Sequence, residues 1–168
     1  MASTYWISSG KMRILGYWIV TLLVVFENAA GFVWAALHIE YLHVMLTHLG
    51  YPQYFMNIIG VWQLACAATL IAPRFPVVKE WAYAGAFFNY SSAFISHLAV
   101  GDRADRWVAP LLFAVLTATS WALRPADRRL SRSTTPRETR VLSWVVPIAI
   151  LILMIVISLF TLPKTPIF

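Results

Sequence analysis

The sequence predicts an all-α fold, an integral membrane bundle of four helices followed by a fifth, C-terminal transmembrane helix. Of its 168 residues, 60% are hydrophobic and only 12% are charged, which is about half the charged share of an ordinary soluble domain. The mean hydropathy is +0.70. A soluble protein of this length could not bury so much apolar surface in one core, so a lipid bilayer is the expected solvent.

The apolar residues fall into five runs, each near the length of about 20 residues that a membrane helix needs. The first contains ILGYWIVTLLVVF and has the length of a full span rather than of a secretory signal. The second and third contain no Lys, Arg, Asp or Glu, the fourth is short but bounded by arginines, and the fifth is the most apolar. The predicted spans cover residues 14–37, 54–73, 81–100, 107–123 and 141–162.

These spans divide the chain into three expected parts. A four-helix unit covers residues 1–124, and an additional transmembrane helix lies in residues 141–168. Residues 125–140 form a basic linker that is rich in arginine and contains two prolines. We expect this linker to lie in the cytoplasm against an anionic lipid surface.

The charges also predict the orientation of the chain in the membrane. Ten of the 13 Lys and Arg residues lie in segments on the N-terminal side of the predicted topology, and three lie on the other side. The positive-inside rule then places the N-terminus in the cytoplasm and the C-terminus, after an odd number of spans, across the cell (inner) membrane. Because the basic residues lie between apolar runs, the net charge of +6 indicates lipid contact and not a nucleic-acid partner.

Polar residues recur near the middle of the predicted spans, where they are costly. Glu27 and Asn28 lie at the centre of the first span and Gln63 at the centre of the second. In the third, Gly85, Asn89, Ser92 and Ser96 share one helix face by their spacing. His97 lies slightly nearer the non-cytoplasmic end. We therefore predict a polar layer inside the bundle.

Of these residues, Glu27 has the largest free-energy cost of insertion into a membrane. A charged acid at the centre of a membrane helix costs about 2.5–3.5 kcal/mol, and no Lys or Arg lies in a predicted span at matching depth. We expect the Glu27 carboxyl to be neutral, or partly ionised beside water, and to hydrogen-bond Gln63, Asn89 or a serine. The same polar residues can equally have a structural role and hold the helices together by hydrogen bonds.

Metal, haem and thiol chemistry are not expected. Cys66 is the single cysteine, so the chain has neither an intrachain disulfide nor a C-x-x-C pair. Glu40 and His43 have the Glu-x-x-His spacing of di-iron bundles, but a second copy of that motif is missing. Haem ligation by two histidines needs a partner for His97 within the spans, and the sequence has none.

Several motifs resemble those of the DoxX-like family of small bacterial membrane proteins. They are Tyr17-Trp18 with Thr21, Gly50-Tyr51-Pro52, Gly60-Val61-Trp62, the run from Pro73 to Gly85, and Ser96-His97-Leu98-Ala99-Val100-Gly101-Asp102. The resemblance covers roughly residues 11–124. It implies a compact four-helix membrane bundle, related to subunits of a thiosulfate:quinone oxidoreductase or terminal quinol oxidase. This chain differs in having Gln63 where the family usually has Lys, and Glu27-Asn28 where it usually has small residues.

The first functional hypothesis is a membrane protein that binds a hydrophobic quinone- or isoprenoid-like molecule in an intramembrane polar pocket. It would be a subunit of a membrane redox assembly, with other redox subunits as partners and a quinone as the cofactor that the resemblance allows. The expected ligand-binding residues are Gln63, Asn89, Ser92, Ser96, Tyr17 and Trp62.

A second hypothesis is a cofactor-free enzyme, an isomerase, cyclase or epoxide-opening hydrolase that acts on a lipophilic small molecule. Glu27 would be the general acid or base, with Asn28 and His97 completing the catalytic set. A third hypothesis is a scaffold subunit whose fifth span docks against a larger membrane complex.

Overall fold

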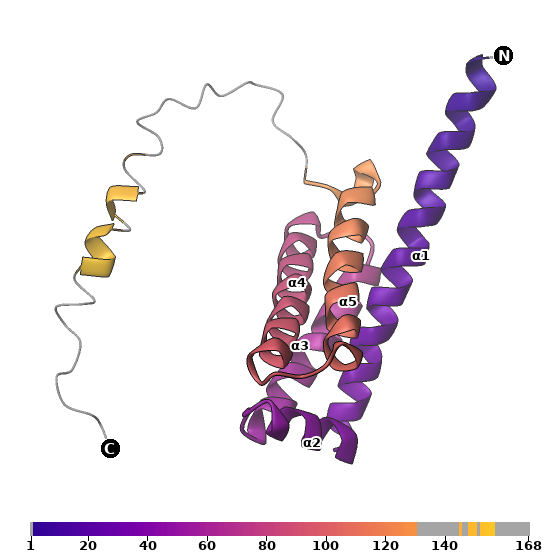
Figure 1. Cartoon of the computed structure of the whole chain (residues 1–168). Coiled ribbons are helices and arrows are strands. Elements are labelled where there is room, and N and C mark those ends of the chain that lie inside the picture. Colours follow the sequence, from indigo (N-terminus) through magenta and orange to yellow (C-terminus); the bar gives the residue numbers. More distant parts are fainter. Residues whose placement is uncertain (1, 131–144, 146–147, 151, 157–168) are drawn as a thin grey trace. The chain divides into compact units, whose positions relative to one another are not determined.

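The computed structural model describes residues 2–130, 145, 148–150 and 152–156, with side chains from Gly10 onward. Residues 1–130 and 131–168 form two units, and each is described by itself. The first unit contains α1 (Ala2–Ala36), α2 (Glu40–His48), α3 (Tyr54–Ile71), α4 (Pro76–Ala99), α5 (Ala104–Leu123) and the short 3-10 helix η1 (Ala126–Arg128) (Figure 1). Its described residues include no strand, so the all-α prediction is confirmed.

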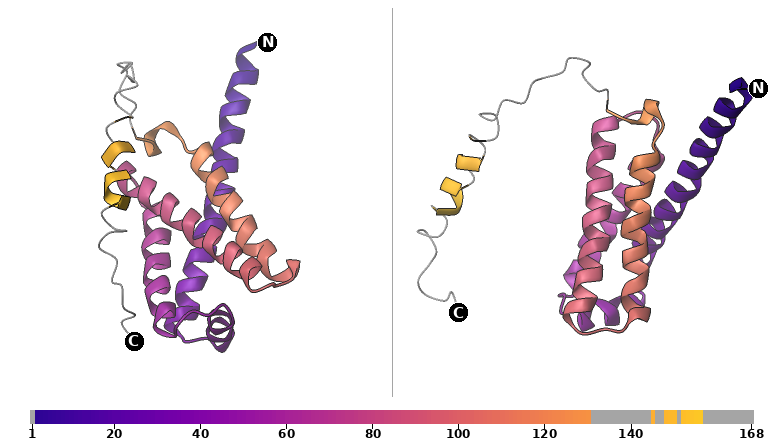
Figure 2. Two further views of the ribbon diagram at one scale, coloured as in Figure 1. Left: turned by 60° about the vertical axis from the view of Figure 1, so that its left-hand side comes forward. Right: turned by 45° about the horizontal axis from the view of Figure 1, so that its top comes forward.

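The long helices of the first unit pack as a bundle. α1 packs against α3 and α5, and α4 packs against α5 and α3, while the short α2 contacts α3 at one end (Figure 2). One face of α1, spaced as on a helix, is buried in these contacts: Tyr17, Thr21, Val24, Asn28 and Ala35. The arrangement brings residues of α1, α3 and α4 together around a common interior.

Two glycines end helices in the same way. Gly50 follows α2 and Gly101 follows α4, both with the positive φ that other residues rarely adopt (82° and 78°). After each glycine, the next amide donates to the carbonyl of the residue five positions before it: Tyr51 to Leu46 and Asp102 to His97. This Schellman arrangement folds Asp102 back over the end of α4.

Large apolar side chains cover much of the outside of the bundle. Trp62, Trp81, Phe26 and Phe88 are each 65% exposed or more, which suits contact with lipid rather than with water. α1 over residues 10–36, α3 and α5 are long and apolar enough to cross a membrane. They correspond to the first, second and fourth predicted spans, so the membrane character is confirmed.

The third and fifth predicted spans are not among these three apolar helices. The third predicted span lies within α4, whose asparagine, serines and histidine keep it out of the set of apolar helices. Between the first and second predicted spans, where the sequence assigned no element, the chain forms the short helix α2, with Leu42 and Leu46 buried. Most of the fifth predicted span, and the linker from residue 131 onward, lie outside the described residues; 145, 148–150 and 152–156 are helical.

Close helix packing in the first unit depends on small residues. At Gly60 on α3, an added Cβ would lie 2.6 Å from the Cβ of Ala35 on α1, a distance that real Cβ atoms do not reach. At Gly85 on α4, an added Cβ would meet no atom within 4 Å. The α1–α3 contact is therefore tight, whereas α4 has open space beside Gly85.

We expect Gly60→Ala to destabilise the protein by about 1–3 kcal/mol, because the added methyl group must push α1 and α3 apart. The matched control Gly85→Ala should be neutral or stabilising by up to about 1 kcal/mol, since alanine favours the helix and has room. Thermal unfolding of the detergent-purified protein, followed by circular dichroism, measures both. Equal unfolding midpoints for the two variants would contradict the tight packing at Gly60.

Candidate functional site

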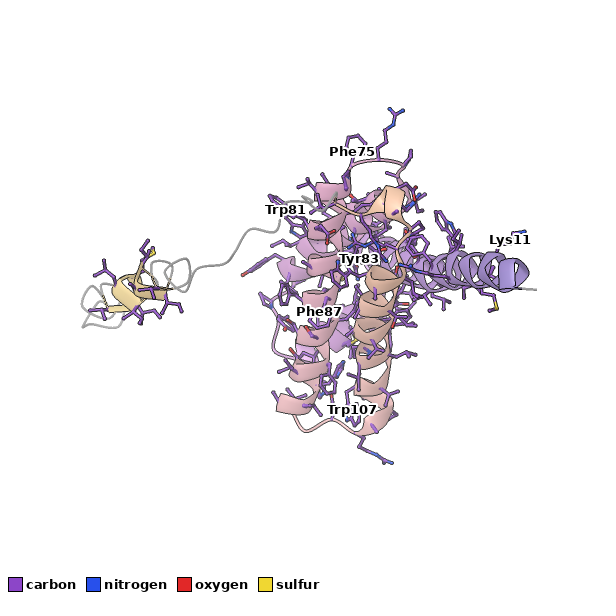
Figure 3. All side chains as sticks on the ribbon, turned by 90° about the horizontal axis from the view of Figure 1, so that it is seen from above. Lys11, Phe75, Trp81, Tyr83, Phe87 and Trp107 are labelled. Carbon is purple, nitrogen blue, oxygen red and sulfur yellow. The ribbon has the colours of Figure 1, made fainter. Side chains whose placement is uncertain are left out.

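A cavity of about 550 Å³ lies between α3 and α4 and reaches Asn28 on α1. Its walls are mostly apolar, with Phe55, Ile58 and Trp62 on α3 and Trp81 and Phe88 on α4. Figure 3 shows Trp81 on the outer side of α4, while Tyr83, two residues later, points toward the other helices. The cavity thus lies beside the packed core and is bordered by exposed aromatic side chains.

Four polar side chains that the sequence placed in a polar layer line this cavity: Asn28, Gln63, Asn89 and Ser92. They come from three helices. Asn89 and Ser92 share the face of α4 that also carries Gly85, as their spacing predicts. Cys66 and Thr69 add a thiol and a hydroxyl to the lining. Trp62, also expected at the site, contributes to the wall.

Asn28 is held firmly in place at the inner end of the cavity. Its Nδ2 atom donates to the carbonyl oxygen of Val24, 2.8 Å away, and to the hydroxyl oxygen of Tyr90, 2.9 Å away. The side chain is almost fully buried, and the Tyr90 ring stacks on Phe113 of α5. Three helices therefore determine the orientation of this one amide.

The Gln63 side chain occupies space that a glycine leaves free. Its amide atoms lie 2.5 Å from where a Cβ on Gly31 would be, so Gln63 packs directly against the backbone of α1. Among residues 10–130, neither Gln63 nor Asn89 shows a side-chain hydrogen bond, which leaves both amides available to a ligand.

Glu27 does not join this group. It is half-buried on α1, it is not among the residues that line the cavity, and its carboxyl accepts no hydrogen bond within the described bundle. The expected hydrogen bond to Gln63, Asn89 or a serine is therefore wrong. Glu27 and Asn28 are about 100° apart around the helix axis, so when Asn28 faces the cavity its neighbour faces elsewhere.

His97 and Ser96 lie at the end of α4, outside the cavity. The Nδ1 atom of His97 and the Nε2 atom of His48 contact the same carboxylate, that of Asp102, at 2.7 and 2.9 Å. Ser96 is hydrogen-bonded to the hydroxyl of Tyr51 at 2.8 Å. These contacts tie α2 and its following turn to α4. The structure does not bring His97 together with Glu27 and Asn28.

Tyr17 belongs to another buried cluster, between α1, α4 and α5. Thr21 donates to the Tyr17 carbonyl, and the hydroxyls of Thr21 and Tyr83 both hydrogen-bond that of Ser120, at 2.7 and 2.9 Å. The guanidinium of Arg128 is 3.4 Å from the Tyr17 hydroxyl. Tyr17 thus belongs to this cluster and does not line the cavity.

The polar contacts near the start of α4 were not predicted from the sequence. Lys79 is 1% exposed, and its ammonium donates to the carbonyl oxygens of Thr69, at 2.6 Å, and Ala72, at the end of α3. Arg124 makes two hydrogen bonds to Glu80, which also accepts from Trp121. The glutamate and arginine are far apart in the sequence, so only their residue types could have hinted at this pair.

Comparison with known proteins gives one match. The model of the DoxX-like family matches residues 19–120, which is more than half of the chain and includes the cavity and α3, α4 and most of α5. Neither the curated proteins nor the solved structures contain a match.

Asp102 gives the site region a testable pH dependence. Hydrogen bonds from His97 and His48 hold the pKa of the Asp102 carboxyl below its ordinary value. The ionised carboxylate is therefore stabilised in the folded protein, and this stabilisation is lost as the pH falls below about 4. We expect the unfolding midpoint of the wild type to fall more steeply below pH 4 than that of Asp102→Asn.

The matched control is Asp105→Asn, because Asp105 is exposed in the first turn of α5. It should retain the steep wild-type profile. Thermal unfolding between pH 3 and 7 measures all three proteins, and parallel profiles for the wild type and Asp102→Asn would contradict the stabilising role of the two histidine contacts.

Proposed function

We propose that this chain, which belongs to the DoxX-like family, is a multi-pass membrane protein that binds a lipophilic small molecule in the cavity between α3 and α4. The observation that carries the proposal is the cavity itself, about 550 Å³ in volume, with mostly apolar walls and a few polar side chains in its lining. That volume and that lining are typical of small-molecule sites.

The membrane arrangement is part of the proposal. α4 is 24 residues long, about 36 Å at 1.5 Å per residue, which is enough to cross the hydrocarbon core. Its polar residues Asn89, which is half-buried, and Ser92, which is exposed, both line the cavity. We therefore propose α4 as a fourth crossing beside the three apolar helices, and residues 141–162 as the fifth, with the N-terminus in the cytoplasm.

A ligand of the quinone or isoprenoid type fits the lining. Its chain would lie along Phe55, Ile58 and Trp62 and pass between the exposed rings of Trp62 and Trp81 toward the lipid. Its head group would reach the amides of Gln63, Asn89 and Asn28. Because none of the lining side chains is an acid or a cationic base, the head group that suits the cavity is uncharged.

The cellular role that we propose is a binding subunit of a membrane redox assembly, with a quinone as the bound molecule in that setting. This role rests on the resemblance to quinone-handling relatives. The enzyme hypothesis has weaker support, since of Glu27, Asn28 and His97 only Asn28 lines the cavity. No contact among the described residues favours a scaffold role over binding.

Filling the cavity tests the binding proposal. Gly85→Leu places a side chain into open space beside α4, so it should fold and should lower the retained ligand at least about tenfold by occupying its volume. Organic extraction and mass spectrometry of the detergent-purified full chain measure the amount of lipophilic molecule per protein.

The matched control is Gly10→Leu on α1, which also has open space and lies outside the cavity. It should retain ligand like the wild type. Equal ligand content in Gly85→Leu and Gly10→Leu, or an empty wild type that takes up no added quinone or isoprenoid, would contradict the proposal.

A further inference from the structure

We infer that the head group bound in this cavity carries a hydroxyl, as in a lipophilic alcohol or phenol, and that Asn28 selects it by accepting its hydrogen bond. The inference rests on the proposed binding function and names the chemical class of the ligand. It follows from the orientation of a single amide.

The orientation of the Asn28 amide is determined by its partners. A backbone carbonyl has no hydrogen to donate, so the Asn28 atom 2.8 Å from the Val24 oxygen must be the nitrogen. The second hydrogen on that nitrogen is used by the Tyr90 hydroxyl, 2.9 Å away. Both donors of the amide are therefore occupied within the protein.

The remaining polar atom of Asn28 is its Oδ1, which can only accept. It has no hydrogen-bond partner among residues 10–130, although Asn28 is only 1% exposed. Yet in the described part of the chain no fully enclosed side-chain nitrogen or oxygen lacks a partner. The Oδ1 atom must therefore border open space, and the space that Asn28 borders is the cavity. A ligand placed there has to donate to it.

A hydroxyl meets this requirement and also suits the neighbouring side chains. It donates one hydrogen to Asn28, and its oxygen can accept from the free amide of Gln63 or Asn89. A ketone, an ether or an oxidised quinone can accept from those amides but cannot donate, so it would leave the buried Oδ1 without a partner. Within the quinone class, the reduced quinol is the form that carries the required hydroxyl. A carboxylate or phosphate head would bring a negative charge to that acceptor.

The test is a competition between two ligands that differ only at the head-group oxygen, which carries this hydrogen in one and a methyl group in the other. The detergent-purified full chain is offered equal amounts of farnesol and its methyl ether, and native mass spectrometry measures the ratio of bound alcohol to bound ether. We expect the wild type to favour the alcohol by about tenfold, the usual effect of one buried hydrogen bond with its desolvated acceptor.

Three variants identify the residue responsible. Asn28→Leu should bring the ratio close to one. Asn57→Leu is the matched control, since Asn57 is an exposed asparagine on α3, and it should keep the wild-type ratio. Tyr90→Phe retains the aromatic ring but loses the hydroxyl that holds the Asn28 nitrogen, so the amide can turn and the preference should weaken. Because Tyr90→Phe leaves the packing intact, it tests the inference even where Asn28→Leu does not fold.

The outcomes separate the two proposals. Equal binding of alcohol and ether by the wild type, or an undiminished preference in Asn28→Leu or Tyr90→Phe, would overturn the inference and leave the binding function standing. If neither farnesol nor its ether binds to the wild type, and the purified protein carries no other lipophile, the binding function itself fails.

Discussion

Hydrogen bonding inside a hydrocarbon environment is the constraint on which this structure depends. An unpaired polar group away from water is costly, and lipid around the helices offers no partners. The bundle meets this demand from within. Thr21, Ser120 and Tyr83 form one hydroxyl cluster across three helices, and the ammonium of Lys79 donates to carbonyls at the end of α3. These contacts also hold the helices in register.

In the cavity between α3 and α4, by contrast, several polar atoms lack a hydrogen-bond partner within the protein. Gln63 and Asn89 have free amides there, and Asn28 has both donors bound and its acceptor free. Every fully enclosed side-chain nitrogen or oxygen of residues 10–130 has a partner, yet three amides lie beside one open, apolar-walled space. Three amides with free hydrogen-bonding atoms in one place indicate a site for a hydrogen-bonding ligand. The surrounding Trp, Phe and Ile side chains indicate that this ligand is mostly apolar.

The two ends of the bundle differ from the cavity in that they carry charged side chains. At one end, Arg124 pairs with Glu80, and Arg128 donates to carbonyls of α3 and lies over Trp18, so basic residues close the ends of helices whose carbonyls lack partners. At the other, Asp102 binds two histidines. None of these charged side chains is among the residues that line the cavity.

By itself, the sequence determined the membrane character, the all-α fold, the C-terminal ends of the four long helices and the presence of polar residues in their middle. These follow from local properties: apolar run length, helical spacing and glycines such as Gly101 that end a helix. Only the tertiary structure decided that Asn28 and not Glu27 faces the cavity, that His97 lies apart from it, and that Glu80 meets Arg124. The physical reason is that the rotation of each helix about its axis, and contacts between residues far apart in the sequence, are set by packing. Adjacent residues on a helix point about 100° apart, and which direction faces inward is determined by the helices packed around it.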